Sequence, residues 1–325
     1  MTVSSSDTVV TATDTPIVLG VDGGGTKTLA RVAQLAGDGH LKLLGEGTAG
    51  SSNQVALGVD AAFDNLRQSI DQACSNAGVL RESIAASVVA LAGSGTESAQ
   101  RKILGFAAKQ LKLAHTRVAH DGEAALAAGT PAGWGVALIV GTGAVAFGMN
   151  QSGSTAIVGG WGYWFGDEGS AYWIGLTALR AVAQADDGRA CETKLTPAIL
   201  QDLEVESARE LLNALRKRGD VRLGIANLAP LVCDQAESGD EVAVSLLDTA
   251  AQHWARHVGC VAQQLDMALQ VPLAIAGGVL CGSEYARAKL AQRLASTELA
   301  VESLELVQAP VDGCLKLAAR GLVNF

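Results

Sequence analysis

The chain has 325 residues, 49% of them hydrophobic, which is enough for two domains of ordinary size with substantial cores. Its net charge of −9 argues against nucleic acid or an anionic membrane as the main partner. The six cysteines are scattered without a CxxC pair, a pattern that favours free thiols in a reducing cytosol over a disulfide framework.

The first fifteen residues have neither the basic nor the apolar region of a signal peptide, so we expect residues 1–15 to be a disordered tail. The chain also has no apolar run long enough to cross a bilayer. We therefore expect a cytoplasmic protein.

The first predicted element is a short apolar strand over 17–21, followed by three glycines and a second strand that starts at Thr28. Successive glycines let a backbone approach a ligand closely, and the hydroxyls and Lys27 behind them supply donors and charge. A tight turn of this kind suits phosphate. A plain glycine-rich hairpin explains the stretch equally well when it is taken alone.

The rest of the first half alternates strands and helices. The apolar positions predict a strand near 41–47, a helix over 59–77 that Gly78 ends, and a buried strand over 87–93. A helix over 97–113 and a strand over 116–120 follow. This last strand runs into Asp121 and a predicted helix over 122–128.

The second half starts the pattern again. Residues 135–150 read as strand, Gly-Thr-Gly turn and strand, which repeats the form of 17–34. A long helix is predicted over 241–269, and a strand over 271–280 contains two paired glycines. We place the domain boundary between 16–129 and 130–325, leaving open whether the last helix packs back on the first domain. Two halves that each bind part of one ligand enclose it in the cleft between them.

Five motifs in this order resemble one known family. They are GVDGGGTKT (20–28), HDGEAAL (120–126), IVGTGAVAFG (139–148), GGWGYWFGDEGSAYWIG (159–175) and AIAGGVL (274–280). The sequence resembles the N-acetylglucosamine kinase branch of the BadF/BadG/BcrA/BcrD ATPase-like family, within the superfamily of sugar kinases, heat-shock chaperone ATPases and actin. The resemblance implies an α/β fold of two ribonuclease H-like (actin-like ATPase) domains around a central nucleotide and sugar cleft.

The resemblance also implies a site for ATP and Mg²⁺. The first turn is similar to the family's phosphate-1 loop, and Asp22 would help to hold Mg²⁺ through water, because Mg²⁺ keeps much of its hydration shell. The second turn is similar to the phosphate-2 loop, the paired glycines to the adenosine motif, and LAPLVC (228–233) to the other wall around the base. The implied nucleotide contacts are Gly24, Gly25, Thr26 and Lys27, then Gly141, Thr142, Gly143 and Ala144, then Gly277 and Gly278.

Asp121 matches the family's catalytic aspartate. Phosphoryl transfer to an alcohol needs a carboxylate that takes the hydroxyl proton. Aspartate is also a good N-cap for the helix that follows, and both roles can hold together. The implied sugar contacts are Asn53, Asp121, Gly160, Trp161 and Asp167, with Ser52 or Gln54 as alternatives to Asn53. Trp164, Tyr172 and Trp173 are expected in the core or in the wall of the cleft.

The resemblance therefore implies ATP-dependent phosphorylation of N-acetylglucosamine at its 6-hydroxyl, by a protein that we expect to be a homodimer. A glucosamine kinase of the same branch is one alternative. An ATPase activator or a sugar-binding regulator without kinase activity is another, from a different class. His253 and His257 lie four apart on a helix, but Trp254 stands where a zinc protease would have glutamate, so we interpret them as helix-face residues.

Overall fold

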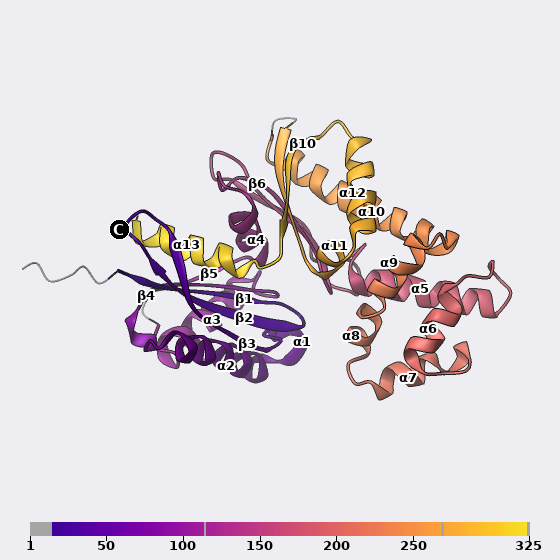
Figure 1. The fold of residues 1–325 in the computed structure, drawn as a ribbon, viewed down its shortest axis with the longest axis horizontal. Coiled ribbons are helices and arrows are strands. Elements are labelled where there is room, and N and C mark those ends of the chain that lie inside the picture. The colour runs from indigo at the N-terminus through magenta and orange to yellow at the C-terminus, as the bar shows by residue number, and fades with distance from the viewer. Residues whose placement is uncertain (1–14, 114, 268–269, 324–325) are drawn as a thin grey trace, which may run out of the picture.

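The computed structural model describes residues 15–113, 115–267 and 270–323. Its first five-stranded sheet has the strand order β3-β2-β1-β4-β5 (Figure 1). In this sheet β1, β2 and β3 are antiparallel neighbours, and β4 and β5 extend it in parallel on the other side of β1. The strands are β1 (Ile17–Gly23), β2 (Lys27–Leu35), β3 (Leu41–Gly50), β4 (Ile84–Leu91) and β5 (Thr116–Ala119).

The second sheet repeats this topology with the order β10-β9-β6-β7-β8. Its first three strands are again antiparallel neighbours, and its last two again add in parallel. The predicted restart of the pattern in the second half is therefore confirmed. The strands are β6 (Gly135–Val140), β7 (Ala144–Met149), β8 (Thr155–Gly159), β9 (Gln270–Ala276) and β10 (Ala300–Val307).

Helix α4 (Asp121–Gly129) lies between the two sheets. It packs against β1 and β4 of the first sheet and against β6, β7, β9 and β10 of the second (Figure 1). The terminal helix α13 (Val311–Val323) packs on α4 and on β1, β2 and β4. Arg31 of β2 fixes it there, because its guanidinium pairs with Asp312 at 2.6 Å and with Glu46 of β3 at 2.8 Å.

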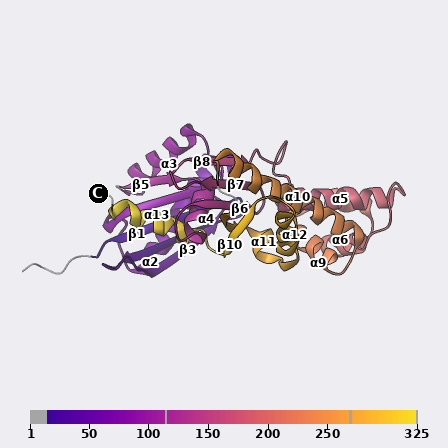
Figure 2. The same cartoon turned by 90° about the horizontal axis from the view of Figure 1, so that it is seen from above.

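The other helices cover the outer faces. Helix α2 (Val59–Ala77) packs on β2 and β3, and α3 (Glu97–Lys109) packs on β5. Helix α10 (Glu241–Gln264) covers β6, β7 and β8. Helices α5, α6 and α9 lie at the end of the molecule away from the first sheet (Figure 2). The remaining helices are α1 (Gln54–Leu57), α5 (Ala171–Asp186), α6 (Leu195–Leu203), α7 (Leu211–Lys217), α8 (Val221–Ala226), α9 (Ala229–Glu237), α11 (Gly278–Gly282) and α12 (Glu284–Ala295), with 3₁₀ turns at Arg81–Ser83 and Ala208–Glu210.

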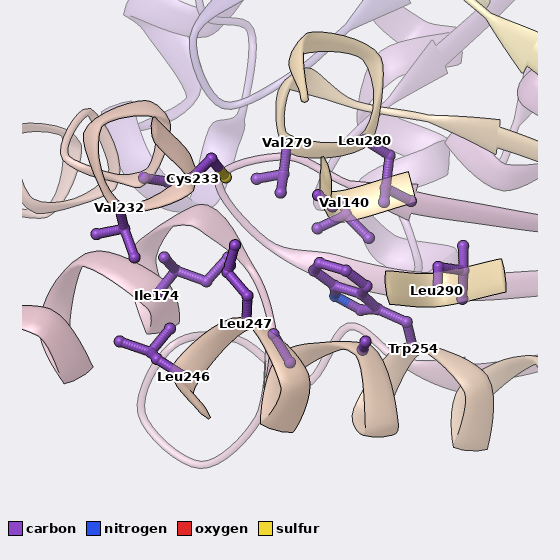
Figure 3. Close-up of a cluster of buried hydrophobic side chains, with 14 of the residues drawn as sticks. Val140, Ile174, Val232, Cys233, Leu246, Leu247, Trp254, Val279, Leu280 and Leu290 are labelled. Atoms are coloured by element: carbon purple, nitrogen blue, oxygen red, sulfur yellow. The ribbon is translucent and has the colours of Figure 1, made fainter. Parts of the chain in front are cut away.

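The largest core belongs to the second half. It includes Val140 of β6, Ile174 of α5, Val279 of α11 and Trp254 of α10, which is fully buried (Figure 3). The indole N–H of Trp254 donates to the carbonyl oxygen of Gly169 at 3.0 Å. A buried indole N–H needs such a partner. This bond ties the long 159–175 motif to the core.

Several predicted boundaries were wrong at chain reversals. The strand predicted over 271–280 ends at Ala276, because Gly277 turns the chain at φ +92° and α11 starts at Gly278. The long helix ends at Gln264 rather than 269, just before Asp266 at φ +46°, and 268–269 lie outside the described residues. Helix α3 ends at Lys109 rather than 113, before Lys112 at φ +56°.

In the segment 228–233, Leu228, Ala229, Val232 and Cys233 are buried in the core, whereas Pro230 is exposed, so a wall around the base stays a prediction. Figure 3 shows Val232 and Cys233 in this core. Residues 1–14 of the predicted tail lie outside the described residues. In the part of the chain that the structure describes, no helix is both long enough and apolar enough to span a membrane.

Candidate functional site

The two glycine-rich turns meet. The first closes between Gly23 and Thr28 of the β1–β2 pair, and the second between Val140 and Ala144 of the β6–β7 pair. Although they are 116 positions apart in sequence, the hydroxyl oxygens of Thr26 and Thr142 lie 3.4 Å from each other. The predicted phosphate-1 and phosphate-2 turns therefore face each other across the junction of the two lobes.

Asp22 is the last residue but one of β1, directly before the first turn. Burial and the charge of Asp121 raise the pKa of Asp22 from 3.8 to about 7, and only Lys27 opposes them. Such a shift means that the Asp22 and Asp121 carboxylates feel each other in a poorly solvated place. The topology brings them together, because Asp22 is near the end of β1 and Asp121 follows β5, which lies parallel to it through β4.

Asp121 is the first residue of helix α4, and the residue before it, His120, is the N-cap, so the alternative of an Asp121 N-cap was wrong. The Asp121 carboxylate has two donors of its own. Its Oδ1 atom lies 2.9 Å from His120 Nδ1 and 2.9 Å from the backbone nitrogen of Gly122. Gly122 N is also 3.0 Å from His120 Nδ1. An ionised carboxylate can only accept hydrogen bonds, so the proton between Nδ1 and Oδ1 belongs to Nδ1. A protonated Nδ1 cannot accept, and the Gly122 N–H therefore donates to the Asp121 carboxylate and not to His120. Burial alone would raise the pKa of Asp121, but the hydrogen bond and charge of His120 and the Gly122 N–H hold this pKa below its usual value.

The residues around Asp22 fit a magnesium ion. Two adjacent carboxylates with one exposed lysine leave excess negative charge, which a divalent cation would neutralise. No cluster of three or more His, Cys, Asp or Glu side chains among the described residues could hold a metal by itself. Mg²⁺ binds in this way through one or two carboxylates, water and substrate phosphate. Asp22 is therefore the predicted residue that would hold Mg²⁺.

Asp167 lies against the second turn. Its Oδ1 atom accepts from the backbone nitrogen of Ala144 at 3.4 Å, and a Cβ atom placed on Gly143 would lie 3.1 Å from its Oδ2. The backbone N–H of Gly160 donates to the carbonyl oxygen of Ala144 at 2.9 Å. Burial raises the pKa of Asp167, opposed by hydrogen bonds from the backbone and by the charge of Arg222. Asp167 and Gly160, both predicted sugar contacts, thus adjoin the predicted phosphate-2 turn.

Aromatic side chains between β8 and α5 point outward. Trp161 is 73% exposed and Trp164 is 80% exposed. Trp164 does not lie in the core, so the wall of the cleft is the expected place left for it, whereas Tyr172 and Trp173 are half-buried against the second core. Trp161, a predicted sugar contact, therefore presents its ring to solvent.

The segment after β3 reaches the first turn. Ser51 Oγ donates to the carbonyl oxygen of Gly24 at 2.9 Å, and the backbone N–H of Asn53 donates to Ser51 Oγ at 3.2 Å. Ser52 Oγ is buried without a hydrogen-bond partner among the described residues. A Cβ atom on Gly23 would lie only 2.0 Å from this hydroxyl. Asn53 and its alternative Ser52 are therefore both next to the first turn.

The paired glycines after β9 differ in their surroundings. A Cβ atom on Gly277 would lie 2.4 Å from the carbonyl of Val140 and 2.8 Å from the nitrogen of Gly141, so this turn packs directly on the second turn. A Cβ atom on Gly278 would meet no atom within 4 Å. Close packing thus explains why position 277 needs a glycine. Gly278, in contrast, faces open space, which the predicted adenosine contact requires.

Three neighbours of the site were not among the predicted contacts. His120 precedes Asp121 in the HDG motif, and its proximity to the carboxylate was the available signal. Arg222 of α8 places its Nη2 atom 3.5 Å from where a Cβ atom on Gly25 would be, and its Cζ atom lies 5.3 Å from the ring centre of Tyr163. Arg222 is nearly 200 positions from the first turn, and only the three-dimensional fold joins them.

The relatives of the chain are kinases of amino sugars. The chain is 32% identical over 269 residues to the N-acetylmuramic acid/N-acetylglucosamine kinase of Clostridium acetobutylicum, covering 82% of this chain and 87% of that protein. It is 27% identical over 233 residues to the glucosamine kinase of Vibrio cholerae, covering 72% and 76%. A solved structure of a proposed N-acetylglucosamine kinase from Chromobacterium violaceum has a TM-score of 0.74, 26% identity, and coverage of 94% of this chain and 99% of that one.

The likeness of the solved structure, together with the repeated sheet topology, confirms the predicted α/β fold of two ribonuclease H-like (actin-like ATPase) lobes. The sequence profile of the BadF/BadG/BcrA/BcrD ATPase family matches residues 19–315. This match spans both sheets, both glycine-rich turns and Asp121. The chain therefore belongs to the BadF/BadG/BcrA/BcrD ATPase family.

Proposed function

We propose that this protein transfers the terminal phosphate of ATP to an amino sugar, and that the acceptor is the 6-hydroxyl of N-acetylglucosamine. The observation that carries the proposal is the meeting of the two glycine-rich turns beside an ionised carboxylate, Asp121, at the start of the helix between the sheets. The named activities of the Clostridium and Vibrio relatives support an amino sugar as the acceptor class.

Asp121 would act as the general base. Its carboxylate takes the proton of the sugar hydroxyl as that oxygen forms a bond to the terminal phosphorus, while the bond from phosphorus to the ADP oxygen breaks. His120 and the Gly122 N–H keep this carboxylate ionised at neutral pH. They also fix its direction, which matters because the transferred proton requires hydrogen-bond distance.

The turns would bind the phosphates of ATP. Turns of this shape present backbone N–H groups and hydroxyls to an anion, and here Thr26 and Thr142 supply the two hydroxyls at the junction. Mg²⁺, when bound by Asp22 through water, neutralises phosphate charge. Gly278 leaves space for the nucleoside beside the second turn.

The sugar would bind where the 159–175 motif reaches the second turn. Asp167 has acceptor capacity left beyond its bond from Ala144, and a carboxylate that accepts from sugar hydroxyls rejects analogues lacking them. The open ring of Trp161 offers an apolar face for the pyranose and its acetamide, where a sugar ammonium would be desolvated at a cost. Asn53, beside the first turn, would fix a further hydroxyl.

The acceptor is tested by ADP formation from ATP across N-acetylglucosamine, N-acetylmuramic acid, glucosamine and glucose. We expect the highest kcat/KM for N-acetylglucosamine, with the 6-phosphate as the product by mass and NMR. A higher kcat/KM for glucosamine would replace the proposal with a glucosamine kinase. Hydrolysis of ATP with no phosphorylated sugar would indicate an ATPase activator or a sugar-binding regulator. Light scattering on the same sample tests the expected homodimer.

A further inference from the structure

We propose that Arg222 binds the terminal phosphate of ATP where the two glycine-rich turns meet, and that the ring of Tyr163 holds its guanidinium in that place. The inference rests on the proposed function, because it names a further phosphate contact in the same site. It adds a cation from helix α8, an element that contains none of the predicted site residues.

The geometry places Arg222 at the junction of the turns. Its Nη2 atom is 3.5 Å from the position of a Cβ atom on Gly25, and the same position is 3.7 Å from the side chain of Thr142. Gly25 is thus flanked by the second turn and by the guanidinium. Asp220 is the N-cap of helix α8, and its carboxylate accepts from the backbone nitrogens of Arg222 at 2.9 Å and Leu223 at 3.3 Å.

Arg222 has no ion pair among the residues that the structure describes. No carboxylate of the described residues lies within ion-pair distance of its guanidinium, so its donors are available to a phosphate. Asp167 is near enough to feel its charge without an ion pair. Guanidinium groups bind phosphate oxygens through two parallel N–H bonds, which gives both strength and direction. Lys27, the other nearby cation, belongs to the first turn and is exposed.

The ring of Tyr163 positions the guanidinium of Arg222. The Cζ atom of Arg222 lies 5.3 Å from the ring centre, within the range of a cation–π contact. The ring is itself held, because it stacks on Trp164 at 5.2 Å and meets Tyr172 edge-on at 5.3 Å. Tyr163 belongs to the 159–175 motif, which also carries Asp167 and Trp161. The proposed phosphate contact and the proposed sugar contacts therefore share one loop.

Arg222→Ala and Arg222→Lys test the proposal, with Arg216→Ala as a matched control. Arg216 is an exposed arginine near the end of α7, in the same group of helices. An arginine that stabilises the charge of a transferring phosphate contributes about 10³–10⁵ in rate in GTPases. We expect a loss of about 10²-fold or more in kcat for Arg222→Ala, a smaller loss for Arg222→Lys, and no change for Arg216→Ala.

Calorimetry separates phosphate contact from a structural role. Arg222→Ala should weaken binding of a non-hydrolysable ATP analogue by about 10-fold while leaving MgADP binding unchanged, as expected for loss of one charge-assisted bond. Tyr163→Phe, which keeps the ring, should behave as the unchanged protein. Tyr163→Leu should reproduce part of the Arg222→Ala effect.

Two results would overturn the inference. One is a kcat for Arg222→Ala within twofold of the unchanged protein. The other is equal weakening of MgADP and the ATP analogue, which would mean that Arg222 supports the lobe in general. If the unchanged protein phosphorylates no sugar, the proposed function fails, but the difference between the analogue and MgADP still decides the role of Arg222.

Discussion

At the scale of single residues, the candidate site depends on two buried carboxylates whose pKa values are shifted in opposite directions by their neighbours. Asp22 has its pKa raised to about 7 by burial and by the charge of Asp121. The pKa of Asp121 is lowered although the same burial acts on it, because His120 and Gly122 donate to it. Environments that separate the ionisation of two acids also assign their roles, with the ionised one suited to be a base.

His120→Phe tests this division of roles. The new ring keeps the stacking on Phe147, whose centre lies 5.6 Å away, but removes the proton donated to Asp121. Burial then dominates, so the pKa of Asp121 rises. Since the base must be ionised, we expect the acid limb of kcat/KM against pH to move to higher pH, with rates at pH 8 changed least. An unchanged acid limb would contradict the account, and the exposed His115→Asn is the control.

The predicted site residues lie in turns and at strand ends. Three glycines behind an apolar strand, or an aspartate after a short strand, have a local physical meaning that needs no fold. Arg222 has no such local meaning, because its place at Gly25 arises from the packing of α8 against α5. The exposure of Trp164 was also not evident, since an aromatic residue beside core residues has the same local pattern whether its loop turns in or out.

At the scale of elements, α4 and α13 join the lobes. A Cβ atom on Gly313 of α13 would lie 1.8 Å from the carbonyl oxygen of Ala124 of α4, so the two helix backbones are in contact. Each helix follows the fifth strand of its own sheet, and each packs on the first sheet. The position of Asp121 at the start of α4 therefore depends on this helix pair.

The substitution Gly313→Ala should push helix α13 away from helix α4. The added methyl group meets backbone atoms that cannot rotate away, and overpacking of this kind costs about 1–3 kcal/mol. Gly321→Ala in the same helix meets no atom within 4 Å, so it should be neutral or stabilise by up to about 1 kcal/mol through helix propensity. Urea unfolding of both variants measures the difference. Equal free energies of unfolding would show that α13 can shift without cost.

Element type was easier to predict from the sequence than element ends. Apolar periodicity predicted α2 over 59–77 and the strands of both hairpins, because the buried face of an element repeats along it. The ends of α3, β9 and α10 were missed where Lys112, Gly277 and Asp266 adopt positive φ values. Most lysine and aspartate residues do not adopt a positive φ, so the residue type alone did not predict these ends.

At the scale of the whole molecule, two sheets of one topology place two similar turns against each other. With 3.4 Å between the hydroxyl oxygens of Thr26 and Thr142, a phosphate has no room directly between them. The proposed function therefore requires the two turns to separate when ATP enters. Lobes that move in this way also limit the access of water to the transferring phosphate.

A paired substitution tests this separation. In Thr26→Cys/Thr142→Cys the two sulfur atoms replace hydroxyl oxygens that nearly touch, so oxidation should link the turns. We expect the oxidised double variant to lose ATP binding and turnover, and reduction to restore both. Each single variant under the same oxidation is the control for the six native cysteines. Normal turnover by the linked protein would show that phosphates do not pass between the turns.

The most direct test of the account is the turnover of Asp121→Asn with ATP and N-acetylglucosamine. Asparagine keeps the size of the side chain and can still accept from the Gly122 N–H, but it cannot take up the hydroxyl proton. The account predicts a loss of about 10²–10⁴-fold in kcat, the usual contribution of a general base, with sugar and MgADP binding by calorimetry retained. A kcat close to that of the unchanged protein would contradict it and would leave Asp121 as the first residue of a helix and nothing more.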